Sequence, residues 1–205
     1  MAHDDDHDHD HDHEHEDEHA HEHEPEEDAR ERAETEARRR LALAQIRQYG
    51  DRALRLIAHD VDDFDDDLRR LVDRMIVLMH DAQGVGLAAT QVGVLRRLFV
   101  FEPDEEGPRA IVNPVVAERA EESVTDDEGC LSLQGVKVPV ERSTRIVLEG
   151  KDPNGEDVHL ELDEYGSRVV QHELDHLDGV LIIDRTDDEH RKEALATLRP
   201  RAVLR

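Results

Sequence analysis

The chain has 205 residues and a formal net charge of -27, and more than half of this imbalance lies at one end. Residues 1–28 contain 15 acidic residues, nine of the 15 histidines and no lysine or arginine. The remaining residues carry 38 acidic and 26 basic side chains, an ordinary balance for an acidic globular domain. Because phosphate contacts need lysine and arginine, this composition argues against broad nucleic-acid binding, and we expect no sequence-specific binding of nucleic acid.

Location is also constrained by the sequence. No apolar run approaches the ~20 residues of a membrane span, and the N-terminus is acidic where a secretory or organellar signal would be basic. The single cysteine, Cys130, cannot form an internal disulfide, which suits a reducing compartment and leaves the thiol available for other chemistry. We therefore expect a cytoplasmic protein without a membrane anchor.

Four segments are expected along the chain. Residues 1–28 alternate His with Asp and Glu and are predicted to be disordered, because they can bury too little apolar surface to offset the entropy of ordering. Residues 29–40 form a charged lead-in with helical character, followed by a compact domain over residues 41–188. A basic C-terminal segment, residues 189–205, completes the chain.

Helices and strands alternate in the compact domain. The clearest helix is predicted over residues 65–83, where apolar residues recur at helical spacing, acidic residues suit the start and Gly84 supplies a stop. Strands are predicted over residues 98–101, 110–113, 144–148 and 158–162. Residues 152–155, Asp-Pro-Asn-Gly, indicate a hairpin, and a second helix is predicted over residues 163–177, ending before Gly179. This order favours an α+β fold with antiparallel strands.

The strongest chemical signal is the run Gln-His-Glu-Leu-Asp-His at residues 171–176, inside the second predicted helix. Residues four apart share a helix face, so His172 and His176 can bind one metal ion with Glu173 beside the metal-bound water. The alternative is a solvated polar helix that matches the pattern by chance.

A third protein ligand would leave one coordination position open for water. One class of zinc proteases places Gly and then His after the motif; Gly179 fits that spacing, but Ile182 stands where the histidine should be, which excludes the class. A downstream carboxylate, Glu189 or Glu193, is one candidate for the ligand. Cys130 is the better candidate, although a lone cysteine is by default a small buried hydrophobe.

Three segments in this order resemble the signature motifs of the peptide deformylases. They are Gly-Val-Gly-Leu-Ala-Ala-Thr-Gln at residues 84–91, Glu-Gly-Cys-Leu-Ser at residues 128–132, and the histidine run at residues 171–176. The resemblance extends over roughly residues 41–188. It implies an α+β fold with strands around a central helix that bears the two histidines.

The resemblance also implies a metal site. Cys130, His172 and His176 would be the ligands of one divalent ion, and Glu173 would act first as general base and then as general acid. Iron(II) is the native ion that the resemblance implies, while zinc, nickel and cobalt are compatible with a thiolate and two imidazoles.

Other positions carry over in the same way. Gln91 through its side-chain amide and Leu131 through its backbone N–H would stabilise the oxyanion. Val85 and Gly86 would pair main chain to main chain with the bound peptide. Glu128 would brace the cysteine segment through an ion pair with a nearby cation.

The implied activity is hydrolytic removal of the formyl group from N-formylmethionyl peptides, which releases formate. Residues such as Leu133 and Val169 are candidates for an apolar methionine pocket. Two other functions remain open: an ordinary His-Glu-x-x-His metallopeptidase, and a metal-handling protein on a deformylase-like scaffold. One departure is Gln134, where many members have proline, so the sequence leaves the shape of the loop after Cys130 open.

The C-terminal residues 191–205 hold five basic side chains against one acid. C-terminal segments of some family members touch the ribosome, and a basic strip suits ribosomal RNA. The alternative is a solvated terminal helix broken by Pro200.

The N-terminal tail offers imidazoles and carboxylates at high density, so it either binds metal ions weakly or serves only as a solubilising polyanion. If the tail binds metal, calorimetric titration of the full chain with zinc or nickel should show one tight site and several weak ones, because imidazole suits both ions. A variant lacking residues 1–28 should keep only the tight site. Identical stoichiometry in the two proteins would refute metal binding by the tail.

Overall fold

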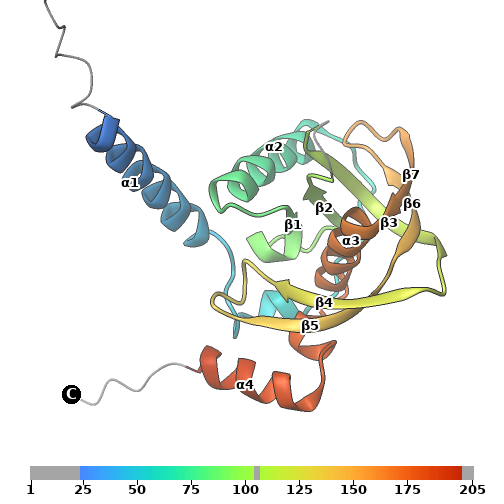
Figure 1. Cartoon of the computed structure of the whole chain (residues 1–205). Helices are drawn as coiled ribbons and strands as arrows, with labels where there is room; N and C mark the ends of the chain where they lie inside the picture. The colour runs from blue at the N-terminus through green and yellow to red at the C-terminus, as the bar shows by residue number, and fades with distance from the viewer. Residues whose placement is uncertain (1–23, 104–106, 200–205) are drawn as a thin grey trace, which may run out of the picture.

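The computed structural model describes residues 24–103 and 107–199 (Figure 1). Most of the predicted N-terminal tail lies outside these residues. Helix α1, Glu24–Leu43, begins before residue 28 and so includes the last residues of the predicted tail. Ion pairs one turn apart, such as Arg30 with Glu34 at 3.0 Å, support this charged helix without a core of its own.

A five-stranded antiparallel sheet in the order β1-β2-β3-β6-β7 forms the centre of the fold. A separate antiparallel ribbon consists of β4 and β5. The strands are β1 Gly86–Ala88, β2 Leu98–Phe101, β3 Arg109–Arg119, β4 Ser123–Gly129, β5 Lys137–Ser143, β6 Arg145–Lys151 and β7 Asp157–Asp163. The α+β fold class is therefore confirmed, and β1 lies at an edge of the sheet.

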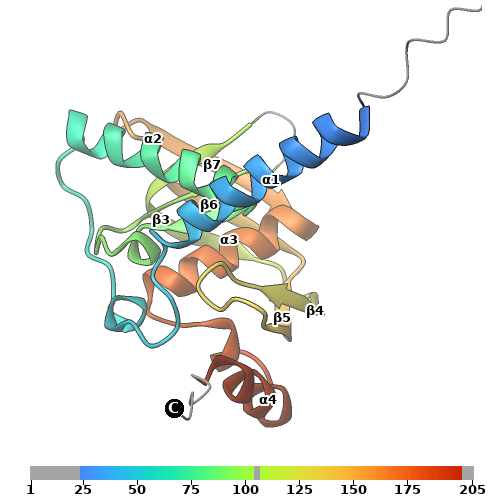
Figure 2. The ribbon, with the colours of Figure 1, turned by 90° about the vertical axis from the view of Figure 1, so that its left-hand side faces the viewer.

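The other helices pack on the sheet and the ribbon. They are α2 Asp66–Asp81, α3 Glu164–Leu177 and α4 Asp188–Leu198, with short 3-10 turns η1 Arg52–Arg55, η2 Ala89–Val92 and η3 Ile182–Asp184. Helix α3 runs between the sheet and the β4–β5 ribbon (Figure 1), while α1 and α2 lie together and α4 lies at the opposite end of the molecule (Figure 2).

Both helices predicted in the compact domain are present. In α2, Asp65 caps the N-terminus, and buried Leu68, Val72 and Met75 face the sheet. The helix ends at Asp81, two residues before the predicted end, because Gln83 takes a left-handed conformation with a φ of 58°. The second helix agrees with its prediction to within one residue.

The predicted strands agree less evenly with the structure. Strand β2 matches residues 98–101, but β3 continues to Arg119 and both strands of the ribbon were missed. Six of the seven residues of β4 are exposed, and its sequence Ser-Val-Thr-Asp-Asp-Glu-Gly lacks a sustained apolar alternation. The strand forms because β5 pairs with it residue by residue, which is a long-range cause that local pattern does not encode.

Candidate metal centre and active site

The donor atoms of three residues converge where α3 passes the end of β4. Cys130 follows β4 directly, and His172 and His176 lie one turn apart on α3. Their ligand atoms all lie within 4.8 Å of one another, with Cys130 Sγ at 3.2 Å from His176 Nε2. Bonds from a metal ion to sulfur and nitrogen are about 2.0–2.3 Å, so two of them span up to about 4.6 Å, close to the upper limit of the spacing here. The donor set and its spacing therefore fit one divalent ion.

The downstream carboxylates do not join this cluster. Glu189 and Glu193 are exposed on α4, and within residues 24–103 and 107–199 the cysteine and the two histidines are the single group of three with metal-ligand spacing. The geometry therefore favours Cys130 over Glu189 and Glu193 as the candidate for the third ligand position.

Glu128 is buried and holds the site together through charge. It accepts hydrogen bonds from Arg142 Nε and Nη2 at 2.9 and 3.0 Å and from Arg168 Nη1 at 2.9 Å, and it lies 3.0 Å from His172 Nδ1. Burial by itself would raise the pKa of Glu128, but hydrogen bonds with His172 and Arg142 outweigh it and bring the pKa to about 2. Nδ1 of His172 is thereby occupied, which leaves Nε2 for a metal ion.

The second histidine lies in a different environment. Burial, followed by the charges of His172 and Arg142, lowers the pKa of His176 well below its ordinary value. A neutral imidazole is the form that binds metal. Thr90 Oγ1 donates to the carbonyl of His176 at 3.1 Å and fixes the helix at this point.

Glu173 is buried next to the candidate ligands. Its Oε2 has no hydrogen-bond partner, and burial raises the pKa of its carboxyl to about 7. A Cβ on Gly86 would come within 2.3 Å of Glu173 Oε1, so only glycine lets β1 pass this close. A carboxyl group with this pKa can both accept and return a proton near neutral pH.

Gln91 presents its amide to the same point. The N–H of Ala88 donates to Gln91 Oε1 at 2.8 Å, which fixes the orientation of the amide. Gln91 Nε2 then faces Ser132 Oγ at 3.1 Å and Cys130 Sγ at 3.8 Å. The fixed amide therefore directs its NH₂ group toward the metal centre.

The segment between α1 and η1 supports the residues around the cysteine. Arg47 N–H donates to the carbonyl of Gln91 at 2.7 Å, and Tyr49 N–H donates to the carbonyl of Ser132 at 2.8 Å. These bonds join the two loops that carry the predicted oxyanion donors.

Gln48 completes this support through its side chain. Its Nε2 donates to the carbonyl of Leu131 at 3.2 Å, and Gln134 Nε2 donates to Gln48 Oε1 at 3.0 Å. The residue that stands where many deformylases have proline is thus tied to the loop by hydrogen bonds. The sequence contained no signal for this pairing, because 86 positions separate the two glutamines.

A cleft of about 720 Å³ opens over these groups. The predicted residues that line it are Val85, Gly86, Gln91, Cys130, Leu131, Leu133, Val169, His172 and Glu173. His176 is almost fully buried beneath it. The edge strand β1 forms one side of the cleft, so its outer main-chain groups face the space that a peptide would occupy.

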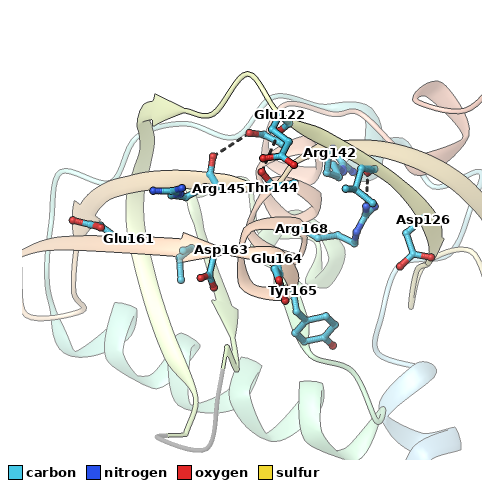
Figure 3. Close-up of a pocket in the computed structure, with 13 residues that line it drawn as sticks. Glu122, Asp126, Arg142, Thr144, Arg145, Glu161, Asp163, Glu164, Tyr165 and Arg168 are labelled. Carbon is cyan, nitrogen blue, oxygen red and sulfur yellow. Dashed lines mark hydrogen bonds between the residues drawn. The ribbon is translucent and has the colours of Figure 1, made fainter.

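A second hollow, of about 770 Å³, adjoins the cleft (Figure 3). Arg168 and Tyr165 line both spaces, and the hollow contains no metal-ligand cluster among the described residues. Arg168 is held by Glu128 and by the carbonyls of Val140 and Val124, at 2.9 and 2.7 Å from its Nη1 and Nη2. Sequence reasoning missed Arg142 and Arg168, because isolated arginines carry no pattern that marks them as buried partners of Glu128.

Comparison with known proteins agrees with this geometry. Residues 43–192 match the polypeptide deformylase family. The chain belongs to this family. The peptide deformylase of Acidothermus cellulolyticus is 48% identical over 159 residues, which cover 78% of this chain and 87% of that protein.

Solved deformylase structures are similar as well. The peptide deformylase from Thermotoga maritima has 46% identity and a TM-score of 0.68, covering 69% of this chain and 96% of that one. The enzyme from Synechococcus elongatus in complex with actinonin has 38% identity and a TM-score of 0.71, covering 74% and 85%. The family prediction is thus confirmed, and with it a metal-dependent hydrolase. No helix in the described part of this deformylase is long and apolar enough to cross a membrane.

Proposed function

We propose that this deformylase hydrolyses the formyl amide of N-formylmethionyl peptides by means of Glu173 and a metal ion held by Cys130, His172 and His176. The observation that carries the proposal is the unpaired, buried carboxylate of Glu173 beside three converging metal-ligand atoms. A metallopeptidase would also need a glutamate and a metal ion. The family match and the proposed cysteine ligand both favour deformylation over an ordinary metallopeptidase or a metal-handling protein.

The metal supplies Lewis acidity, which lowers the pKa of water and polarises the formyl carbonyl. Cys130 would bind as thiolate and the two histidines through Nε2. Thiolate and imidazole favour softer divalent ions, so iron(II) is proposed as the native metal, with zinc, nickel or cobalt as substitutes.

Glu173 moves the proton. Its carboxylate takes a proton from the attacking water, and its acid form returns that proton to the amine that leaves as formate is released. A pKa of about 7 places the group between these two states at neutral pH. Gly86 allows the carboxyl to lie against β1, where the scissile amide would be bound.

Gln91 and Leu131 would stabilise the negative charge that develops on the formyl oxygen. The amide of Gln91 is already oriented by Ala88, so its NH₂ group needs no reorganisation during the reaction. The N–H of Leu131 is the second donor. Each well-placed donor of this kind is typically worth about 3 kcal/mol of barrier.

The peptide would lie along β1. The outer main-chain groups of Val85 and Gly86 are proposed to pair with it as an added strand. Leu133 and Val169 are buried apolar residues in the wall of the cleft and are proposed as part of the pocket for the methionine side chain.

Replacement of Glu173 with alanine should lower the rate of formate release from formyl-Met-Ala-Ser by at least about a hundredfold, because it removes the proton carrier. The assay uses anaerobically prepared iron(II) protein, and metal content should stay near one ion per chain. The matched control is Glu189→Ala, which removes the rival carboxylate ligand on α4 and should change neither activity nor metal content. Full activity in the Glu173 variant would refute the mechanism, and metal loss in the Glu189 variant would refute the ligand assignment.

Gln48 should act as a positioning residue for Leu131. Gln48→Ala is expected to lower kcat about three- to tenfold with little change in KM, because the loop that carries a charge-stabilising N–H loses a support while the peptide-binding edge is untouched. Gln134→Ala, which leaves the bond from Gln48 to Leu131 in place, should have a smaller effect. An effect on KM alone, or a kcat change explained by a lower melting temperature, would contradict this role.

The proposed setting is the cytoplasm, where formylated chains leave the ribosome. Helix α4 carries Lys192 and is followed by Arg199, which support ribosome contact through RNA phosphates. Co-sedimentation with ribosomes at low salt should weaken when both are changed to glutamate, while activity on a free peptide stays unchanged. Unaltered co-sedimentation would refute the contact.

A further inference from the structure

Helix α1 borders the cleft, although all of it except Leu43 precedes the residues that match the family model, 43–192. Arg39 and Leu43 from its last two turns line the same space as Glu173. The helix extends from the body at this point, as both ribbon views show (Figures 1 and 2). Arg39 therefore adds to the cleft wall a residue that lies before the match to the family model.

The guanidinium of Arg39 has few partners for its charge and its N–H donors. Its Nε is buried and has no hydrogen-bond partner, and its Nη1 lies 3.8 Å from Glu36 Oε2. Glu36 is already engaged by Arg40 at 3.1 Å. By contrast, Arg168, another arginine of the cleft, makes three hydrogen bonds of 2.7–2.9 Å. Arg39 thus retains donors for an additional anion.

Gly86 indicates how Arg39 lies relative to a bound peptide. Gly86 lies against Glu173, so the formyl group belongs at this end of the edge. The chain runs back from Gly86 to Gln83, which lines both the cleft and a small hollow against α1. A bound peptide in strand conformation advances about 3.3 Å per residue, so three of its residues cover roughly 10 Å. Side chains two or three residues after the methionine would therefore reach α1.

We propose that Arg39 is a specificity-determining residue that binds a carboxylate side chain two or three residues after the formylmethionine. The inference rests on the proposed placement of the peptide along β1. The protein carries a net charge of -27, so its overall field repels acidic peptides. The guanidinium of Arg39, which has N–H donors without a partner, offsets this repulsion near the peptide side chain two or three residues after the formylmethionine. It can bind a carboxylate there through two parallel hydrogen bonds.

Formate release from formyl-Met-Ala-Glu-Ala amide and formyl-Met-Ala-Ala-Glu amide is compared with release from the same peptides containing glutamine, using the metal-loaded full chain. For at least one position, kcat/KM should favour glutamate by about tenfold at low salt, and the preference should shrink as ionic strength rises. In Arg39→Ala the preference should vanish or reverse. In Arg39→Glu a peptide with lysine at that position should become the preferred one.

Two control variants separate Arg39 from other cations. Arg38 is exposed and does not line the cleft, and Lys137 is an exposed cation that does line it. Both Arg38→Ala and Lys137→Ala should retain the glutamate preference. Equal ratios in the parent protein and Arg39→Ala, or loss of the preference in Lys137→Ala with retention in Arg39→Ala, would overturn the inference. Absence of formate from all four peptides would instead contradict the proposed function.

Discussion

The site depends on the charged hydrogen bonds that the buried carboxylate of Glu128 makes with two arginines and a histidine. Glu128 lies one residue before the end of β4 and joins Arg142 of β5 to Arg168 and His172 of α3, so three elements meet at one charge. Removing one partner from such a network typically costs about 3–5 kcal/mol, because the remaining charges stay buried without compensation. Asp175, which binds Arg142 at 2.6 Å, extends the network to the end of α3. The cysteine loop and the histidine helix are thereby held in one arrangement.

The pKa values of two buried glutamates in this site are shifted in opposite directions, because their surroundings differ. Glu128 is surrounded by cations, which keep its pKa at about 2 and its charge permanent. Glu173 has no partner on one oxygen, and burial raises its pKa to about 7. A permanent charge orients a histidine, whereas a carboxyl near its pKa exchanges protons. The environment therefore suits Glu128 to structural support and Glu173 to the proposed proton transfer, although the two residues are of the same type.

Helix α1 and the residues that follow it contact the site directly. Helix α1 contributes Arg39 to the cleft, and the following residues hydrogen-bond the carbonyls of Gln91, Leu131 and Ser132. The Arg- and Glu-rich composition predicted a helical lead-in here but not these contacts. Gln134 shows the same limit: the sequence marked it as a departure from the family, and the structure shows a hydrogen bond to Gln48 where a proline would have stiffened the backbone.

The sequence by itself determined what depends on neighbours along the chain. Helical spacing located α2, and α3 was predicted to end before Gly179. The His-Glu-x-x-His pattern placed two candidate ligands on one helix face, and three motifs in order indicated the family. The tertiary structure alone decided what depends on packing. The pairing of β4 with β5, the arginines around Glu128, the support of Leu131 by Gln48 and the position of Arg39 all join residues far apart in sequence. Such contacts arise only when the chain is folded, because local pattern carries no information about which distant side chain will fill a given space.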